Sequence, residues 1–206
     1  MIVLSFNAAI DRALALADGG RTILGIAGCP GAGKSTVSAA IAGQVASSVV
    51  VPMDGFHLLN EELVRLGRRD RKGAPDTFDV GGYVDLLERI RRQAAGEIVT
   101  APRYDRAASA PVADAIAVDS DVKLVVTEGN YLLLDEPPWL HVRQLLDEVW
   151  FVDIDDAVRV PRLIRRHIEF GKPPDEASEW VMRSDEANAA LVVASRNRAD
   201  VVVRLT

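Results

Sequence analysis

Residues 28–35 read Gly-Cys-Pro-Gly-Ala-Gly-Lys-Ser and match the pattern G-x-x-x-x-G-K-[ST] at every position. Glycines allow such a loop to curl, so that successive backbone N–H groups point at phosphate oxygens, and the helix that follows adds the partial positive charge of its N-terminus. The motif comes after the short apolar run 22–27 and opens a helical stretch over about 34–46. Because a chance match in a glycine-containing turn would lack this setting, the sequence predicts a strand–loop–helix unit that binds a nucleoside triphosphate.

The residues of this phosphate loop (residues 28–35) have different expected tasks. Lys34 can reach the β- and γ-phosphates, and the Ser35 hydroxyl can ligate Mg²⁺, so ATP and Mg²⁺ are the expected cofactors. Cys29 occupies a free position of the motif and is predicted to be a small filler. The predicted nucleotide-binding positions here are Gly28, Pro30, Gly31, Ala32, Gly33, Lys34, Ser35 and Thr36.

The rest of the chain alternates short apolar runs with helical patterns, which predicts an α/β fold around a mostly parallel sheet. We find no repeat and no convincing linker, so we expect one domain over residues 1–206. Residues 96–120 are expected to form short strands and turns outside the sheet. The further predicted strands are 48–54, 123–127, 148–154 and 200–205, and the predicted helices are 6–17, 83–90, 156–170 and 175–193.

Composition excludes several classes of protein. The formal net charge is −6, so the chain lacks the overall positive field of a nonspecific nucleic-acid binder, and no nucleic-acid partner is expected. No run is apolar enough to span a membrane, and the first residues carry no basic segment typical of a secretory signal. A cytoplasmic location without membrane insertion is therefore expected, and the single cysteine fits a reducing compartment.

Three carboxylates fall at the predicted ends of strands, where ligands of a parallel sheet collect. Asp54 and Glu128 suit phosphoryl transfer, since one carboxylate can take the proton of an acceptor hydroxyl and another can hold hydrated Mg²⁺. Asp153 is predicted to be structural, and Asp155 or Asp156 to cap the next helix.

Further motifs occur in a fixed order after the phosphate loop: Asp-Gly-Phe-His at 54–57, Lys-Gly-Ala-Pro-Asp-Thr-Phe-Asp at 72–79, Ala-Pro-Arg-Tyr-Asp-Arg at 101–106 and Glu-Gly-Asn at 128–130. In this respect the chain resembles the P-loop kinase group that holds uridine kinase, phosphoribulokinase and bacterial pantothenate kinase. Within that group it is most similar to bacterial proteins called fructose transport system kinases. The resemblance implies a P-loop NTPase fold of the nucleoside-kinase-like type, a parallel sheet sandwiched by helices.

The resemblance also implies roles for individual residues. It makes Asp54 the catalytic base, places Glu128 near Mg²⁺, and places a lid near residues 156–175 whose arginines cover the transferring phosphoryl group. Pro161 falls near the start of this predicted helix, where a proline can bend the helix and shift the register of those arginines. The implied sets are Lys34, Asp54 and Arg166 for catalysis; Asp54, His57, Tyr104, Arg106 and Glu128 for the acceptor; Ser35 and Glu128 for the metal; Arg162, Arg165 and Arg166 for the lid; and Asn197 and Arg198 near the adenine.

Two other features allow alternative interpretations. The basic stretch 65–72 is either a solvated face or a wall of the acceptor site that tolerates an anion. The tryptophans at 139, 150 and 180 are expected to pack in the protein rather than to form a platform for substrate.

Taken with the resemblance, these residues predict an ATP-dependent kinase that phosphorylates a hydroxyl of a small metabolite, with a sugar such as fructose as the leading acceptor. Pantothenate and nucleosides are alternative acceptors. A regulatory ATP-binding module linked to sugar transport is a further alternative, and a homodimer is possible. A GTPase is disfavoured, because no N-K-x-D stretch is present to bind guanine.

Overall fold

The computed structural model describes residues 2–205 and confirms the α/β class. Within these residues a six-stranded sheet has the order β1-β8-β7-β2-β6-β3, with every pair parallel. The central strands are almost continuously apolar, as expected for strands that are buried on both faces. The strands are β1 (Ile2–Ser5), β2 (Thr22–Gly28), β3 (Ser48–Pro52), β6 (Leu124–Gly129), β7 (Glu148–Asp153) and β8 (Val201–Arg204).

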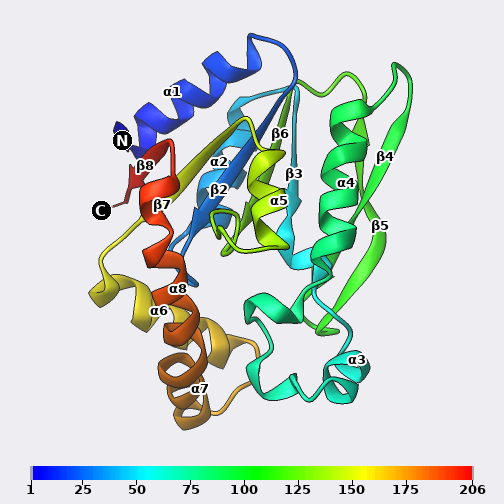
Figure 1. The fold of residues 1–206 in the computed structure, drawn as a ribbon. Coiled ribbons are helices and arrows are strands. Elements are labelled where there is room, and N and C mark those ends of the chain that lie inside the picture. The colour runs from blue at the N-terminus through cyan, green and yellow to red at the C-terminus, as the bar shows by residue number, and fades with distance from the viewer. Residues whose placement is uncertain (1, 206) are drawn as a thin grey trace.

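Helices cover both faces of the sheet (Figure 1). Helix α1 (Phe6–Ala17) packs on α2 (Lys34–Gln44), and α4 (Val80–Arg92) packs on α5 (Trp139–Gln144). The strand order together with right-handed crossovers places these two pairs on opposite faces. Asp79 caps α4 by accepting a hydrogen bond from the Gly82 N–H.

The remaining elements lie beside the sheet or beyond one end of it. Strands β4 (Ile98–Asp105) and β5 (Ala110–Asp119) form a separate antiparallel hairpin, which is the predicted excursion from the sheet. Figure 1 shows α3 (Asn60–Arg65), α6 (Asp156–Glu169) and α7 (Pro174–Trp180) beyond the lower end of the sheet. A π-helical turn, Val181–Asp185, joins α7 to α8 (Glu186–Ala194).

Two boundaries differ from expectation. Strand β1 is not predicted by the sequence, because it is four residues long and mostly exposed at the edge of the sheet. Strand β3 ends at Pro52 rather than at Asp54, because residues Met53–Phe56 turn into a 3₁₀ helix.

Pairing register brings the carboxyl ends of three strands together. Pro52 of β3 lies beside Glu128 of β6, and Gly129 of β6 lies beside Ala27 of β2. The phosphate loop, the turn that carries Asp54 and the side chain of Glu128 therefore meet at one edge of the sheet, where ligands of such folds bind. Across residues 2–205, no helix is both long and apolar enough to cross a membrane.

Gly55, next to Asp54, is expected to be essential for the position of this turn. A Cβ at Gly55 would overlap the carbonyl oxygen of Pro102 in β4, whereas a Cβ at Gly43 in α2 would meet no atom within 4 Å. We predict that Gly55→Ala lowers the free energy of unfolding by about 1–3 kcal/mol. The control Gly43→Ala should raise it by up to about 1 kcal/mol. Urea unfolding of both variants measures this, and equal stabilities would contradict the prediction.

Candidate active site

The phosphate loop connects β2 to α2 along a path that requires glycine. Gly31 and Gly33 have φ values of +80° and +96°, in the left-handed region that residues with side chains rarely adopt. A Cβ on Gly31 would also lie 3.1 Å from the Cβ of Leu163. Helix α6 therefore packs closely against the phosphate loop. The left-handed glycines give the backbone of that loop the form of an anion-binding nest.

The ammonium group of Lys34 lies inside this loop. Its Nζ donates hydrogen bonds to the carbonyl oxygens of Gly28 at 2.9 Å and Cys29 at 3.0 Å, and to Oδ1 of Asn130 at 2.7 Å. Burial lowers the pKa of Lys34, while the charges of Glu128 and Asp54 oppose that shift. All three N–H donors are thus engaged by neutral oxygens, which phosphate oxygens can replace with a gain in charge attraction.

Ser35 and Glu128 form the candidate metal site. The Ser35 hydroxyl donates to Oε1 of Glu128 at 2.9 Å. Burial raises the pKa of Glu128, the charge of Lys34 opposes that shift, and the nearby charge of Asp54 adds to it. The part of the chain that the structure describes holds no group of three or more His, Cys, Asp or Glu side chains suited to a metal. Two hard oxygen donors fit Mg²⁺, which commonly binds through few protein ligands together with phosphates and water.

Asp54 faces the same space from the 3₁₀ turn after β3. Its Oδ2 lies 3.3 Å from Nη2 of Arg106, which follows β4 at the end of the hairpin. The guanidinium of Arg106 also lies over the ring of Phe170, 5.6 Å from its centroid, and so connects the hairpin to the segment after α6. The carboxylate of Asp54 is about one-third exposed, at 32 %, so an acceptor in the cavity can reach it.

His57 lies between two aromatic rings on the acceptor side. Its ring centroid is 4.1 Å from that of Phe78 and 4.7 Å from that of Tyr104. Its Nδ1 is 2.8 Å from the carbonyl oxygen of Asp54, a contact in which only a protonated Nδ1 can donate. In the neutral ring, Nε2 therefore keeps its lone pair and can accept a hydrogen bond from a substrate hydroxyl.

We predict that stability falls with acid because of His57. Burial lowers the pKa of His57 below the value of 6.5 that an unfolded histidine has. Between these two pKa values the unfolded chain binds the proton and the folded chain does not, so the free energy of unfolding falls as pH drops below 6.5. NMR titration should give a midpoint for this ring below 6.5. His57→Gln should lose less stability than wild type between pH 7.5 and pH 5, and an equal loss would contradict the prediction.

Helix α6 supplies the cations of the candidate lid. Pro161 lies inside α6 without ending it, and Arg162 and Arg166 line the cavity. Burial lowers the pKa of Arg166, and the charge of Arg106 adds to that shift. Arg165 does not line the cavity, which corrects the expectation that all three arginines cover the transferring group. At about 100° per residue, positions 162 and 166 lie about 40° apart around the helix axis, whereas position 165 lies about 100° from position 166.

Arg159 joins this helix to the phosphate loop. Its guanidinium is almost fully buried and donates to the Pro30 carbonyl oxygen at 3.2 Å, to Asp156 at 2.7 Å and to Glu186 at 2.9 Å. The loop, the first turn of α6 and the start of α8 are therefore held together by one side chain. Arg159 has no predicted role, because two of its three partners, Pro30 and Glu186, lie 129 and 27 residues away along the chain.

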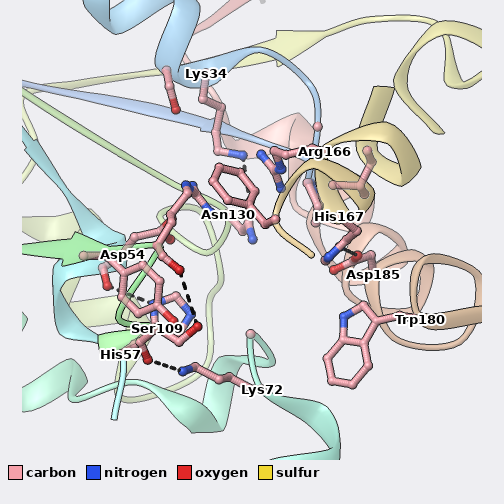
Figure 2. A pocket seen from close by; sticks show the side chains of 18 of the residues that line it. Lys34, Asp54, His57, Lys72, Ser109, Asn130, Arg166, His167, Trp180 and Asp185 are labelled. Atoms are coloured by element: carbon pink, nitrogen blue, oxygen red, sulfur yellow. Dashed lines mark hydrogen bonds and ion pairs between the residues drawn. The ribbon is translucent and has the colours of Figure 1, made fainter. Parts of the chain in front are cut away.

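These groups surround one cavity of about 520 Å³ (Figure 2). The close-up shows Lys34 and Arg166 on one side, Asp54 and His57 on another, and Trp180 on the far wall. Of the residues predicted from the sequence, those lining the cavity are Pro30, Gly31, Gly33, Lys34, Ser35, Thr36, Asp54, His57, Tyr104, Arg106, Glu128, Arg162 and Arg166.

Other predicted residues lie outside this lining. Gly28 and Ala32 are buried in the phosphate loop. Asn197 and Arg198 belong to a 3₁₀ turn before β8, and Arg198 pairs with Asp135 at 2.9 Å, so their contact with adenine stays a prediction. Asp153 is paired with Arg196 at 2.8 Å, and Asp155 caps α6, as expected.

Sequence reasoning missed several residues of the cavity wall. Asn130, which contacts Lys34, was visible only as the last residue of a motif at the end of a strand. Trp139 and Trp150 are buried as expected, but Trp180 is half-buried on the cavity wall, with the ammonium of Lys172 4.5 Å from its ring centroid. The other lining residues without a predicted place there include Phe78, Ser109, Leu163, His167, Phe170 and Asp185.

The sequence matches the model of the phosphoribulokinase/uridine kinase family over residues 23–206. The chain belongs to this family. Its members transfer phosphoryl groups from ATP, so the protein is an ATP-dependent phosphotransferase with an alcohol acceptor, a small-molecule kinase of the P-loop group.

Individual proteins are similar to this chain over most of its length. "Putative uridine kinase C227.14" of Schizosaccharomyces pombe is 34% identical over 196 residues, covering 89% of this chain and 83% of that protein. "Uncharacterized protein YggC" of Escherichia coli K12 is 35% identical over 192 residues, covering 90% and 78%. A crystal structure from Silicibacter sp. TM1040, described as a "putative fructose transport system kinase", has a TM-score of 0.83 and 35% identity, with 95% of each chain covered.

Proposed function

We propose that this protein transfers the γ-phosphoryl group of ATP to a hydroxyl of a small polar metabolite, with a sugar as the leading acceptor. The observation that carries the proposal is the position of Asp54. Its carboxylate faces the same cavity as Lys34 and the Ser35–Glu128 pair, so a base for the acceptor lies opposite the groups that would hold the triphosphate. Phosphoryl transfer needs the base and the phosphate-binding groups on opposite sides, because the acceptor oxygen and the leaving oxygen must be in line across the transferred phosphorus.

The phosphate side of the cavity would bind and polarise the nucleotide. The backbone of the phosphate loop surrounds the phosphates, and Lys34 exchanges its carbonyl partners for phosphate oxygens. Ser35 and Glu128 would hold Mg²⁺, which supplies positive charge to the phosphate oxygens when bound. We further propose that residues 156–175 act as a lid, with Arg162 and Arg166 contacting the transferring phosphoryl group.

The acceptor side of the cavity is polar and aromatic. Asp54 would accept the hydroxyl proton as the oxygen attacks, and Arg106 would keep that carboxylate oriented. The rings of His57 and Tyr104 lie beside it, and such rings commonly pack on the C–H faces of a sugar while His57 Nε2 accepts from a hydroxyl. The "fructose transport system kinase" similarity supports a sugar, whereas the "uridine kinase" similarity supports a nucleoside.

A coupled assay of ADP formation tests this proposal. The full-length protein is supplied with magnesium and ATP, and with hexoses, pentoses, nucleosides or pantothenate one at a time. We expect at least one acceptor, a sugar first, to raise ADP formation by tenfold or more over the rate without acceptor. ADP formation that no acceptor changes would contradict the proposal and would favour a regulatory module that hydrolyses ATP.

A further inference from the structure

The wall of the cavity opposite the phosphate loop carries positive charge that a neutral acceptor would not need. We propose that the acceptor carries a fixed negative charge, a phosphate ester or a carboxylate, which is bound by Lys72 while its hydroxyl faces Asp54. This inference rests on the proposed kinase function and narrows the class of acceptor.

The charge of the cavity differs in sign from that of the whole protein. The chain has a formal charge of −6, yet the cavity wall includes seven Lys and Arg side chains against three carboxylates. Six of these seven have no carboxylate within 4.0 Å anywhere in residues 2–205, the exception being Arg106 beside Asp54. Unpaired cations gathered around a cavity attract anionic ligands.

Lys72 stands apart from the cations that would contact the triphosphate. Figure 2 shows it at the opposite end of the cavity from Lys34, with Asp54 and His57 between them. Its Nζ lies 5.3 Å from the ring centroid of Tyr104, and the Tyr104 ring packs at a tilt against that of His57. A small acceptor placed along these two rings would therefore have one end at Asp54 and the other at Lys72.

The ammonium of Lys72 is held in place without being neutralised. It donates to Oδ1 of Asn60 at 2.7 Å and to the carbonyl oxygen of Ser109 at 2.9 Å, and both of these acceptors are uncharged. An ammonium group has three N–H donors, so one remains for a ligand in the cavity that Lys72 lines. The two contacts fix the position of the charge in advance, which favours binding of an anion.

Neighbouring cations in the same basic stretch show what a structural role looks like. Arg68 and Arg71 both pair with Asp76, at 3.2 Å and 2.9 Å, and Arg65 pairs with Glu62. None of these three lines the cavity, whereas Lys72 and Arg69 do. The stretch therefore divides into residues that pair with carboxylates and unpaired residues that line the cavity. Arg69 is exposed, and its positive charge would also attract the anion.

Binding of matched probes tests the inference. The full-length protein is first saturated with magnesium and a nonhydrolysable ATP analogue, so that an anionic probe cannot bind in the phosphate loop. Calorimetry then compares fructose 6-phosphate with fructose, and gluconate with glucitol, so that a phosphate ester and a carboxylate are each measured against a neutral partner. We expect at least one anionic probe to bind at least tenfold more tightly than its partner. The pair with the larger ratio identifies the type of anion.

Variants separate the charge of Lys72 from its structural contacts. Lys72→Met should reduce the anionic-to-neutral affinity ratio to below about threefold, and Lys72→Arg should keep most of it. Loosening of the loops around Asn60 and Ser109 would instead weaken both probes of a pair equally. Lys123→Met, at an exposed position outside the cavity, removes the same charge and should leave the ratio unchanged.

Two results would overturn the inference. One is that no anionic probe binds more tightly than its neutral partner, including the case in which none binds; the other is that Lys72→Met leaves the ratio intact. The kinase proposal is tested separately, by transfer. If a neutral sugar is phosphorylated and anions are not preferred, the inference fails and the kinase proposal stands, whereas preferential anion binding without transfer to any acceptor contradicts the kinase proposal.

Discussion

Lys34→Ala is expected to lower the rate of phosphoryl transfer by about a thousandfold or more. The ammonium is held by the phosphate loop and Asn130, at 2.7–3.0 Å from its three partners. A water molecule that filled the space left by Lys34→Ala would carry no positive charge. Removing one fixed donor from the stabilisation of a transition state costs about 10²–10³ in rate, and removing a cation from phosphoryl transfer costs more. Single-turnover measurements with saturating ATP give the rate directly.

A loss of transfer by Lys34→Ala must be distinguished from unfolding of the variant. Lys34 is buried, so the thermal transition of Lys34→Ala should be compared with that of wild type, and Lys34→Arg tested as a variant that keeps the charge. We expect a folded protein in both cases, with transfer impaired in Lys34→Arg as well, because the planar guanidinium cannot occupy the site of a compact ammonium. A folded Lys34→Ala protein that transfers phosphate at the wild-type rate would exclude Lys34 from catalysis.

Asp54→Asn is expected to reduce the rate of transfer by about 10²–10⁴ while leaving ATP binding within about threefold. The amide keeps the shape of the carboxylate but cannot take a proton from the acceptor hydroxyl. Its loss of the ion pair with Arg106 should cost less than about 1 kcal/mol of stability, because the two side chains are 32 % and 43 % exposed. Rate, nucleotide affinity and stability are therefore predicted to respond separately.

Asp153→Asn provides the matched control. Asp153 is the last residue of β7, whereas Asp54 follows β3, but Asp153 pairs with Arg196 at 2.8 Å and does not line the cavity. The same chemical change there should leave the rate of transfer near that of wild type. Equal effects of the two substitutions, or full transfer by Asp54→Asn, would remove Asp54 as the base.

The parts of the fold that were predictable are those specified locally. The phosphate loop, strand β2 before it and helix α2 after it follow from a continuous motif, and the buried strands β6 and β7 follow from short apolar runs. Strand β1 was not predictable, because its four residues acquire their role by pairing with β8 at the other end of the chain.

The candidate site was only partly predictable for a similar reason. Glu128 is marked by its place near the end of β6 and Asp54 by its place just after β3, and the pairing of Pro52 with Glu128 then brings the two regions together. Lys72 differs from Arg71 only in its surroundings, since one contacts Asn60 and Ser109 and the other pairs with Asp76. The basic residues of such a stretch can be divided into paired and unpaired ones only from the three-dimensional structure, which shows which groups lie beside each side chain.

The lid shows the limit of a resemblance as a guide to individual side chains. The resemblance assigned Arg162, Arg165 and Arg166 to the lid together, but only Arg162 and Arg166 line the cavity. Which side of a helix meets a cavity depends on how the helix packs. Here that packing is fixed by Leu163 against the phosphate loop and by the buried Arg159.

The fate of a labelled γ-phosphoryl group tests the central claim most directly. The protein is incubated with ATP labelled at the γ-phosphorus and an acceptor mixture of sugars, sugar phosphates and sugar acids, and the products are separated. We predict that the label appears in an organic phosphate ester, and that Asp54→Asn abolishes that ester while Asp153→Asn does not. Label found only in inorganic phosphate, at the same rate with and without acceptors, would contradict the account.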